Sequence, residues 1–166
     1  MTRRSKSSST ILWAPWRKAY ILNLPKKRKE VCVFCQMIRS ANDQKNLIVK
    51  RTKYAFAVLN LYPYNNGHLL IVSKKHVSDF EGLTDSETLD LTKLQNEMIL
   101  RLKKRLKPHG FNLGVNLGAT GGAGVVGHLH IHIVPRWTGD TNFMPVVGKT
   151  KVISESLRSL YDRIKT

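Results

Sequence analysis

The amino-acid sequence predicts an α+β domain with an antiparallel sheet of about five strands, one long helix and one short helix. Short runs rich in branched and aromatic residues alternate with turn residues over most of the chain, as they do in sheet proteins. One longer stretch carries apolar residues at helical spacing, which indicates a helix with one buried side. The turns between strand candidates are short, and short turns favour antiparallel pairing.

Three strand candidates precede the long helix. They cover residues 47–49, 54–61 and 68–72, which are rich in branched and aromatic side chains. The turn at 62–67 separates the last two, and its proline, asparagines and closing glycine are typical turn residues. These strands are therefore expected to lie in one sheet.

The long helix has clear start and stop signals. Thr84 and Glu87 have the spacing of a capping box, in which a hydroxyl and a carboxylate satisfy the first free backbone amides. The helix is expected to end before Pro108 and Gly110. Its apolar stripe consists of Leu91, Leu94, Met98, Leu102 and Leu106.

Two more strand candidates follow the long helix. They cover residues 111–117 and 128–134, and a glycine-rich turn at 118–127 separates them. A short helix is expected to start near Ser154. The apolar residues of this short helix are Leu157, Leu160, Tyr161 and Ile164.

The composition indicates one basic domain. The chain has 166 residues, a formal net charge of +17 and 42% hydrophobic residues, which suits a single domain with a real core. Residues 1–10 resemble a disordered basic tail, and residues 11–166 are expected to form the domain. No apolar run approaches the roughly 20 residues that a membrane-spanning helix needs. The excess charge indicates an anionic partner: nucleic acid, a membrane surface or a phosphate-rich small molecule.

The basic N-terminal segment admits several interpretations. Nine of the 28 Lys and Arg residues lie in 1–29, and the first acid is Glu30. This segment fits a solvated tail, or weak non-specific attraction to nucleic acid through phosphate neutralisation. Its Arg- and Ser-rich start also fits a mitochondrial transit peptide. The two closely spaced cysteines indicate a reducing compartment, so the cytoplasm is expected, with an organellar matrix as the alternative.

The most specific feature is a run of alternating histidines. Strand side chains point to opposite faces in turn, so His128, His130 and His132 share one face of the strand at 128–134. Histidine is only intermediate in its tendency to be buried, so three imidazoles on one face are not expected to serve as core packing. Three such rings predict either a catalytic zinc with an open fourth position or a histidine nucleophile with helpers that position it and protonate a leaving group.

The flanks of this strand favour phosphate chemistry. The glycine-rich turn before it offers bare backbone N–H groups to an anion. Arg136 follows it and is a cation suited to phosphate. A phosphate site beside histidines predicts nucleotidyl or phosphoryl transfer through a histidine adduct.

The run His-Leu-His-Ile-His-Ile-Val resembles the defining pattern of the histidine triad (HIT) superfamily of nucleotide hydrolases and transferases. The resemblance covers residues 11–153 and is strongest to the prokaryotic diadenosine tetraphosphate phosphorylase-like branch, which is similar to the fragile histidine triad hydrolases. It implies a HIT-like fold and a homodimer with joined sheets. The further matching segments are Leu12-Trp13-Ala14-Pro15-Trp16-Arg17, Cys32-Val33-Phe34-Cys35, the segment from Asn60 to His68 and the segment from Pro135 to Phe143.

The resemblance also implies roles for individual residues. His130 matches the histidine that attacks the α-phosphorus, and His132 matches the one that contacts the α-phosphate and the leaving group. Asn60 matches the position that holds the ribose hydroxyls. His68 and Asn116 match residues near the phosphates.

One departure from the family pattern concerns the turn before the triad. Many relatives carry a Gln and a Ser or Thr there, whereas this chain has Ala123-Gly124-Val125 and one more residue. Phosphate contacts are then expected from backbone N–H groups, Gly124 among them. This leaves the acceptor, phosphate or water, open.

Cys32 and Cys35 have the spacing of a chelating pair. A lone pair of cysteines is half a site, and His76 and His128 are the candidates for the other two ligands. HIT relatives with this cysteine pair use such a set, so the resemblance implies a structural zinc that anchors the triad strand. Two reduced thiols and a redox pair are the alternatives.

Together these features predict an enzyme that cleaves dinucleoside polyphosphates of the diadenosine tetraphosphate type through a nucleotidyl-histidine intermediate, with phosphate or water as acceptor. Cleavage of nucleoside phosphoramidates is a second enzymatic option. A non-catalytic module that binds nucleotides or nucleic acid through its basic surface is the alternative from another class.

Overall fold

The computed structural model describes residues 31–150 and 152–165 of the chain. The predicted tail at 1–10, the basic N-terminal segment and the boundary at residue 11 lie outside these residues. The elements are α2 (Val33–Arg39), β1 (Ile48–Arg51), β2 (Ala55–Leu59), β3 (Leu69–Ser73), α3 (Asp85–Leu106), β4 (Gly110–Val115), β5 (His130–Arg136), α4 (Met144–Val147) and α5 (Leu157–Lys165).

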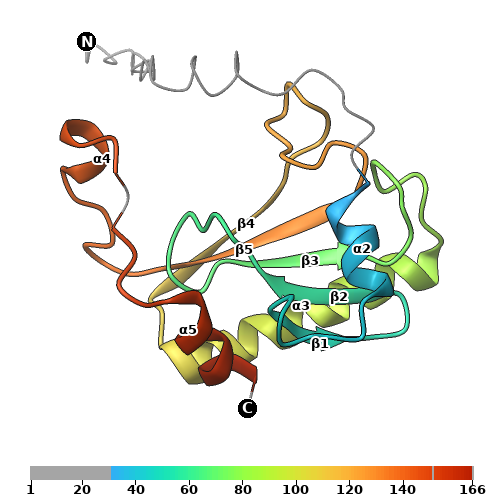
Figure 1. The fold of residues 1–166 in the computed structure, drawn as a ribbon, viewed down its shortest axis with the longest axis horizontal. Coiled ribbons are helices and arrows are strands. Elements are labelled where there is room, and N and C mark those ends of the chain that lie inside the picture. Colours follow the sequence, from blue (N-terminus) through green and yellow to red (C-terminus); the bar gives the residue numbers. More distant parts are fainter. Residues whose placement is uncertain (1–30, 151, 166) are drawn as a thin grey trace, which may run out of the picture. The chain divides into compact units, whose positions relative to one another are not determined.

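The strands form one five-stranded sheet in the order β1-β2-β3-β5-β4 (Figure 1). All four neighbouring pairs are antiparallel, which confirms the predicted α+β class. The strand ends differ from the sequence expectation by one or two residues. The predicted strand at 128–134 begins at His130, so His128 lies just before β5 rather than in it. Because β5 lies between β3 and β4, the histidine strand occupies an interior position of the sheet.

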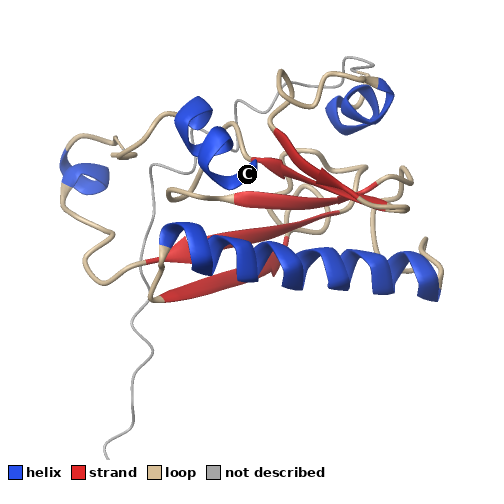
Figure 2. Ribbon diagram, turned by 90° about the horizontal axis from the view of Figure 1, so that it is seen from below, coloured by secondary structure: helices blue, strands red, loops and turns tan. Residues whose placement is uncertain are grey.

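The long helix α3 runs along one face of the sheet (Figure 2). Its stripe of Leu91, Leu94, Met98 and Leu102 is fully buried and packs in one cluster with Leu129, Ile131 and Ile133 of the histidine strand. The predicted capping box is present: the Glu87 N–H donates to Thr84 Oγ1 at 3.3 Å, and the Thr84 N–H donates to Glu87 Oε2 at 2.8 Å. Residues Leu160, Tyr161 and Ile164 of α5 complete the same cluster.

A smaller cluster occupies the opposite face of the sheet. Phe34 of α2 packs there against residues of the first three strands, namely Ile48, Phe56, Val58, Leu70 and Val72. The register pairs Leu70 with His132 and Val72 with His130. Paired residues of neighbouring strands project to the same face, so the triad lies on the α2 side of the sheet.

Within residues 31–150 and 152–165, two helices are additional to the one long and one short helix that the sequence predicts. Helix α2 has seven residues and one buried side chain, Phe34, and α4 has four residues and none. Helices this short do not repeat an apolar stripe, so periodicity does not detect them. Across the described residues, the structure contains no helix with both the length and the apolar character needed to cross a membrane.

Candidate functional site

His130 presents an unprotonated ring nitrogen. Its Nδ1 lies 2.8 Å from the backbone oxygen of His128, and a carbonyl can only accept, so Nδ1 carries the proton. Burial lowers the pKa of His130 below its ordinary value, although the bond to the His128 carbonyl opposes the shift. The ring is therefore neutral near pH 7, and Nε2 keeps the lone pair that a nucleophile needs.

His132 has the opposite tautomer, and a chain of contacts fixes it. The Tyr64 N–H donates to His68 Nδ1 at 2.9 Å, so that nitrogen is an acceptor and His68 is neutral with its proton on Nε2. His68 Nε2 lies 2.9 Å from His132 Nδ1 and donates to it. His132 therefore carries its own proton on Nε2.

The Nε2–H of His132 has no partner. It is one of two buried side-chain polar atoms without a hydrogen bond among the described residues, and such a group is costly unless a ligand satisfies it. Burial, and secondarily the neighbouring His130, lowers the pKa of His132 to about 4. The ring is thus a neutral donor placed beside a neutral nucleophile, since the centroids of the two rings are 5.1 Å apart.

Two aromatic side chains hold the imidazoles in place. Phe34 of α2 contacts the rings of His128 and His130, with centroids 5.3 and 5.2 Å away. Tyr64 stacks on His132 at an interplanar angle of 11° and a centroid distance of 5.5 Å. Neither role was predicted from the sequence, because Tyr64 lies in a turn and Phe34 lies in a helix too short to show an apolar pattern.

The four predicted metal ligands converge. Ligand atoms of Cys32, Cys35, His76 and His128 all lie within 4.8 Å of one another. Cys32 Sγ is 3.3 Å from His128 Nδ1, and Cys35 Sγ is 3.2 Å from His76 Nδ1. Two cysteines three positions apart at the start of α2 thus meet one histidine after β3 and one before β5.

The tautomer of His128 suits metal binding. Its Nε2 lies 2.7 Å from the Ser73 backbone oxygen and must donate to it, which leaves the Nδ1 lone pair facing the thiols. Metal-bound histidines commonly donate their other N–H to a carbonyl in this way. Two sulfurs with two imidazole nitrogens are a donor set typical of tetrahedral zinc, so these residues fit the implied metal.

Asn60 and the glycine-rich turn also lie near the triad strand. Asn60 Nδ2 is 3.3 Å from His68 Nδ1, so its amide adjoins the chain of contacts that ends at His132. Asn116 directly follows β4, and its Nδ2 donates to the Gly122 carbonyl at 3.4 Å, which links the strand to the turn. Gly124 is exposed in that turn, and a side chain placed there would meet nothing within 4 Å.

Arg136 lies apart from the other predicted residues, at the far end of β5. Its guanidinium donates two bonds to Asp140, at 2.6 and 2.8 Å, and one to Asn112 Oδ1 at 2.8 Å. This pairing holds the pKa of Asp140 well below its usual range. The sequence predicts a cation for phosphate, whereas the structure shows a charge that Asp140 neutralises.

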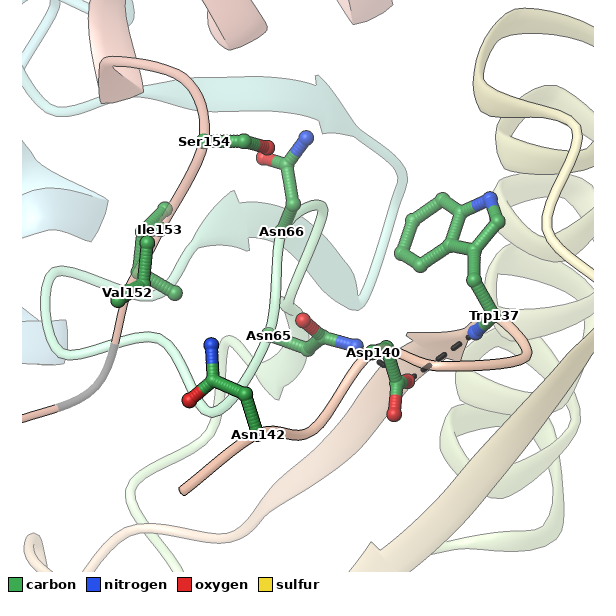
Figure 3. Close-up of a pocket in the computed structure, with 8 residues that line it drawn as sticks. All are labelled: Asn65, Asn66, Trp137, Asp140, Asn142, Val152, Ile153 and Ser154. Atoms are coloured by element: carbon green, nitrogen blue, oxygen red, sulfur yellow. Dashed lines mark hydrogen bonds between the residues drawn. The ribbon is translucent and has the colours of Figure 1, made fainter. Parts of the chain in front are cut away.

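A cavity of about 270 Å³ lies beyond this ion pair, between the 65–66 turn and the chain that follows β5 (Figure 3). Asn65 in its wall donates to Asp140 at 2.7 Å, and the Trp137 N–H donates to the same carboxylate. None of the three triad histidines lines this cavity.

Comparison with known proteins places this geometry in a family. The HIT domain family model matches residues 41–139. The protein named AP-4-A phosphorylase from Mycobacterium tuberculosis (strain H37Rv) is 43% identical over 153 residues, which is 89% of this chain and 78% of that protein. Adenosine 5'-monophosphoramidase HNT1 from Saccharomyces cerevisiae is 29% identical over 126 residues, 76% of this chain and 75% of that protein.

Solved structures share the fold. A hypothetical histidine triad nucleotide-binding protein from Sulfolobus tokodaii matches with a TM-score of 0.66 and 29% identity, over 81% of this chain and 89% of that one. A zinc-bound histidine triad family protein from Mycobacterium smegmatis matches with a TM-score of 0.65 and 20% identity, over 81% and 90%; at that identity the likeness concerns the fold alone.

The sheet and its histidine face define a class of protein in which one strand and the residues just before it present three imidazoles beside a glycine-rich turn. With the family match and the 43% identical relative, this chain belongs to the HIT family.

Proposed function

We propose that this chain is an enzyme that cleaves dinucleoside polyphosphates of the diadenosine tetraphosphate type, with inorganic phosphate as the preferred acceptor. One observation carries the proposal: two adjacent neutral imidazoles have opposite tautomers, with a lone pair on His130 Nε2 and an unpartnered N–H on His132 Nε2. The M. tuberculosis relative named AP-4-A phosphorylase, 43% identical over 89% of this chain, supports the substrate and the acceptor.

In the first step, His130 Nε2 attacks the α-phosphorus. A nitrogen–phosphorus bond forms, and the bond from phosphorus to the bridging oxygen breaks, so that ATP leaves from diadenosine tetraphosphate. His130 then carries a positive charge that its Nδ1–H shares with the His128 carbonyl. The N–H of His132 donates to a phosphate oxygen where negative charge develops.

In the second step, a phosphate oxygen attacks the same phosphorus, the nitrogen–phosphorus bond breaks and ADP is released. Attack by water would release AMP instead. His130 returns to its neutral state in either case, ready for another cycle.

The remaining predicted residues receive substrate-binding roles in this proposal. Asn60, next to His68, would hold the ribose hydroxyls. Backbone N–H groups of the turn that contains Gly124 would contact phosphates, and Asn116 would hold that turn. Arg136 would position the chain after β5 through Asp140 and contact phosphate only indirectly.

A structural zinc held by Cys32, Cys35, His76 and His128 is part of the proposal. Such a metal would fix His128, whose carbonyl in turn orients His130, and so supports the fold and the site without taking part in the reaction. Reduced thiols are required, which fits a cytoplasmic protein. Elemental analysis of protein purified without added metal should find about one zinc per chain; folded, active protein without zinc would contradict this role.

A homodimer joined along β4 is also proposed. β4 is an edge strand of the sheet, and Leu113 in its middle is 49% exposed. An open edge offers unpaired backbone groups to another strand. A second copy related by a two-fold axis would extend the sheet across both subunits, and the mass in solution by light scattering tests this directly.

The decisive experiment incubates the purified chain with diadenosine tetraphosphate, with and without inorganic phosphate. ADP that appears only with phosphate is expected; AMP with ATP would make water the acceptor. Turnover of adenosine phosphoramidate but not of the dinucleotide would support the activity named for the yeast relative and contradict the proposal. Nucleic-acid binding that falls steeply with salt, without any turnover, would favour a binding module.

A further inference from the structure

The side of α3 that faces away from the sheet carries a group of exposed lysines. Leu100 is 65% exposed and marks this outward side, opposite the buried apolar stripe. Lys93 precedes it by seven residues, and Lys103, Lys104 and Lys107 follow it by three, four and seven. Helical periodicity places residues at these spacings on one side of a helix. All four lysines are exposed, and we call them the basic face.

No acid neutralises the basic face. Between Glu97 and Asp140 the chain contains no Asp or Glu. Both of these acids are engaged elsewhere, since Glu97 pairs with Lys50 and Arg101, and Asp140 pairs with Arg136. The ion pairs among residues 31–150 and 152–165 include no lysine of the basic face. Four positive charges therefore remain for an anion from outside the chain.

The basic face is separate from the histidine site. Helix α3 packs on β2, β3, β5 and α5 and lies along the face of the sheet opposite the triad (Figure 2). The proposed reaction and the proposed zinc use the α2 face, and the proposed dimer uses the edge strand β4. An anion bound on the basic face would therefore not compete with a nucleotide at the triad.

The end of a helix explains only part of this charge. Cations in the last turn interact favourably with the free carbonyl groups there, and Lys103 and Lys104 lie in the last turn of α3. This effect falls off within one turn. It accounts neither for Lys93 nor for the lack of acids after Glu97.

The shape and chemistry of the basic face fit the backbone of a nucleic-acid duplex. Lys93 and Lys107 lie about 21 Å apart along the helix axis, and a duplex carries one phosphate charge per about 1.7 Å of its axis. Proteins that hold single strands stack the bases on aromatic rings, whereas α3 contains no aromatic residue. Phosphate contacts alone are sufficient for a duplex and do not depend on its sequence.

An acidic membrane surface fits the basic face less well. Helices that lie on membranes insert a continuous apolar side, but on α3 Lys93 lies between Leu89 and Leu100 on the same side. Exposed Asp85 lies four residues before Leu89 on this side, so a planar anionic surface along the helix would meet a like charge. A duplex that crosses the second half of α3 avoids Asp85.

We propose that the basic face of α3 binds the phosphate backbone of a nucleic-acid duplex while the histidine face remains open to nucleotides. The lysines would displace counterions from the duplex, so binding would weaken steeply as salt rises. DNA and RNA duplexes share this backbone chemistry, and the experiment includes both.

Two triple variants of the full chain test the position of the surface. The basic-face variant combines Lys103→Gln, Lys104→Gln and Lys107→Gln. The control variant combines Lys45→Gln, Lys53→Gln and Lys149→Gln, three lysines that are also exposed. Both variants lose three charges and keep residues 1–30. Each also changes one lysine with a left-handed φ of 49°, so the backbone strain is matched.

Fluorescence anisotropy with a labelled DNA duplex or RNA duplex measures the affinity. The basic-face variant should bind at least one of the two duplexes about tenfold more weakly than wild type, with a salt slope smaller by about 2 to 3. The control variant should lose less than about threefold, because salt at about 0.1 M confines the effect of a charge to about 10 Å. Circular dichroism checks that both variants fold.

The measurement does not use turnover, so it is independent of the proposed activity. His130→Ala should bind the duplex as wild type does, and excess diadenosine tetraphosphate should not displace it. The basic-face variant should keep the wild-type rate of dinucleotide cleavage.

Several outcomes would overturn the inference. Equal losses in the two variants would show that only the total charge matters, and no loss in either would assign binding to other residues. Displacement by diadenosine tetraphosphate would move the duplex to the histidine face. A wild-type chain that binds neither duplex would remove the function. Vesicles of equal parts phosphatidylserine and phosphatidylcholine provide the last arm: a loss of vesicle binding in the basic-face variant, with duplex binding unchanged, would make the surface a membrane contact.

Discussion

The two faces of the histidine strand differ in how they are specified. On the α3 face, Ile131 and Ile133 fill volume in the larger apolar cluster, and their apolar neighbours contribute to that cluster in the same way. On the α2 face, His130 and His132 contribute through the position of single protons, which a backbone carbonyl and a second histidine determine. A packed core tolerates substitution by side chains of similar shape. The tautomer of a histidine depends on every hydrogen-bond partner of its ring nitrogens.

Of the changes that distinguish the two faces, removal of the nucleophile should have the largest effect. His130→Ala is expected to lower kcat by about a thousandfold or more, because no other group with a free lone pair lies at that position. Nucleotide affinity should be largely retained, as measured by calorimetry. His109→Ala is the matched control, since that exposed histidine contacts Thr138 and lies outside the triad. Undiminished cleavage by the His130 variant would refute the assignment.

Truncation on the opposite face should separate stability from chemistry. Ile133→Ala removes a fully buried side chain and should lower the free energy of unfolding by about 3 kcal/mol. The kcat of the protein that remains folded should change little, because the imidazoles keep their partners. Urea unfolding followed by circular dichroism measures the first quantity. A large loss of kcat without loss of stability would contradict the division between the faces.

The histidine relay should have an intermediate effect. His68→Ala removes the donor to His132 Nδ1, so the proton of His132 is no longer held on Nε2. We expect kcat to fall by about a hundredfold, with little change in stability relative to Ile133→Ala. NMR of ring nitrogens should show that His132 loses its single tautomer. If the tautomer persists in the variant, the relay has no orienting role.

The effect that is smallest at neutral pH concerns the protonation of His132. The pKa of His132 is about 4 in the folded chain and near 6.5 when unfolded, so the unfolded chain binds more protons between these values. The free energy of unfolding is therefore highest above about pH 6.5 and declines as the pH falls towards 4, because the folded chain resists protonation of His132. His132→Gln should flatten this decline in the free energy of unfolding. Equal pH slopes for variant and wild type would contradict the lowered pKa.

The sequence alone predicted most features that depend on a regular spacing of apolar and polar residues. The division of residues 128–134 into two faces, the long helix and its cap, and the sheet class all follow from alternation, helical spacing and turn residues. The convergence of Cys32, Cys35, His76 and His128 was inferred as a set and is present in the structure. The two faces, the long helix and the sheet class depend on residue type at fixed spacing, whereas the set of four ligands was implied by the family resemblance.

The remainder depends on contacts that have no sequence period. The tautomer of His132 originates in the backbone N–H of Tyr64, and any residue but proline supplies such a group. Asp140 neutralises Arg136 from four residues away, although strand and turn geometry, rather than helical spacing, brings them together. Single hydrogen bonds of this kind are specified only after the chain is folded.

The interior position of β5 also limits how this chain can change in length. One inserted residue within β5 would exchange its faces, burying the histidines against α3 and turning isoleucines towards the site. The glycine-rich turn before it is exposed and carries no such register, so extra residues there leave every downstream side chain on its own face. Variation among related chains should therefore gather in that turn, and β5 should keep a constant length.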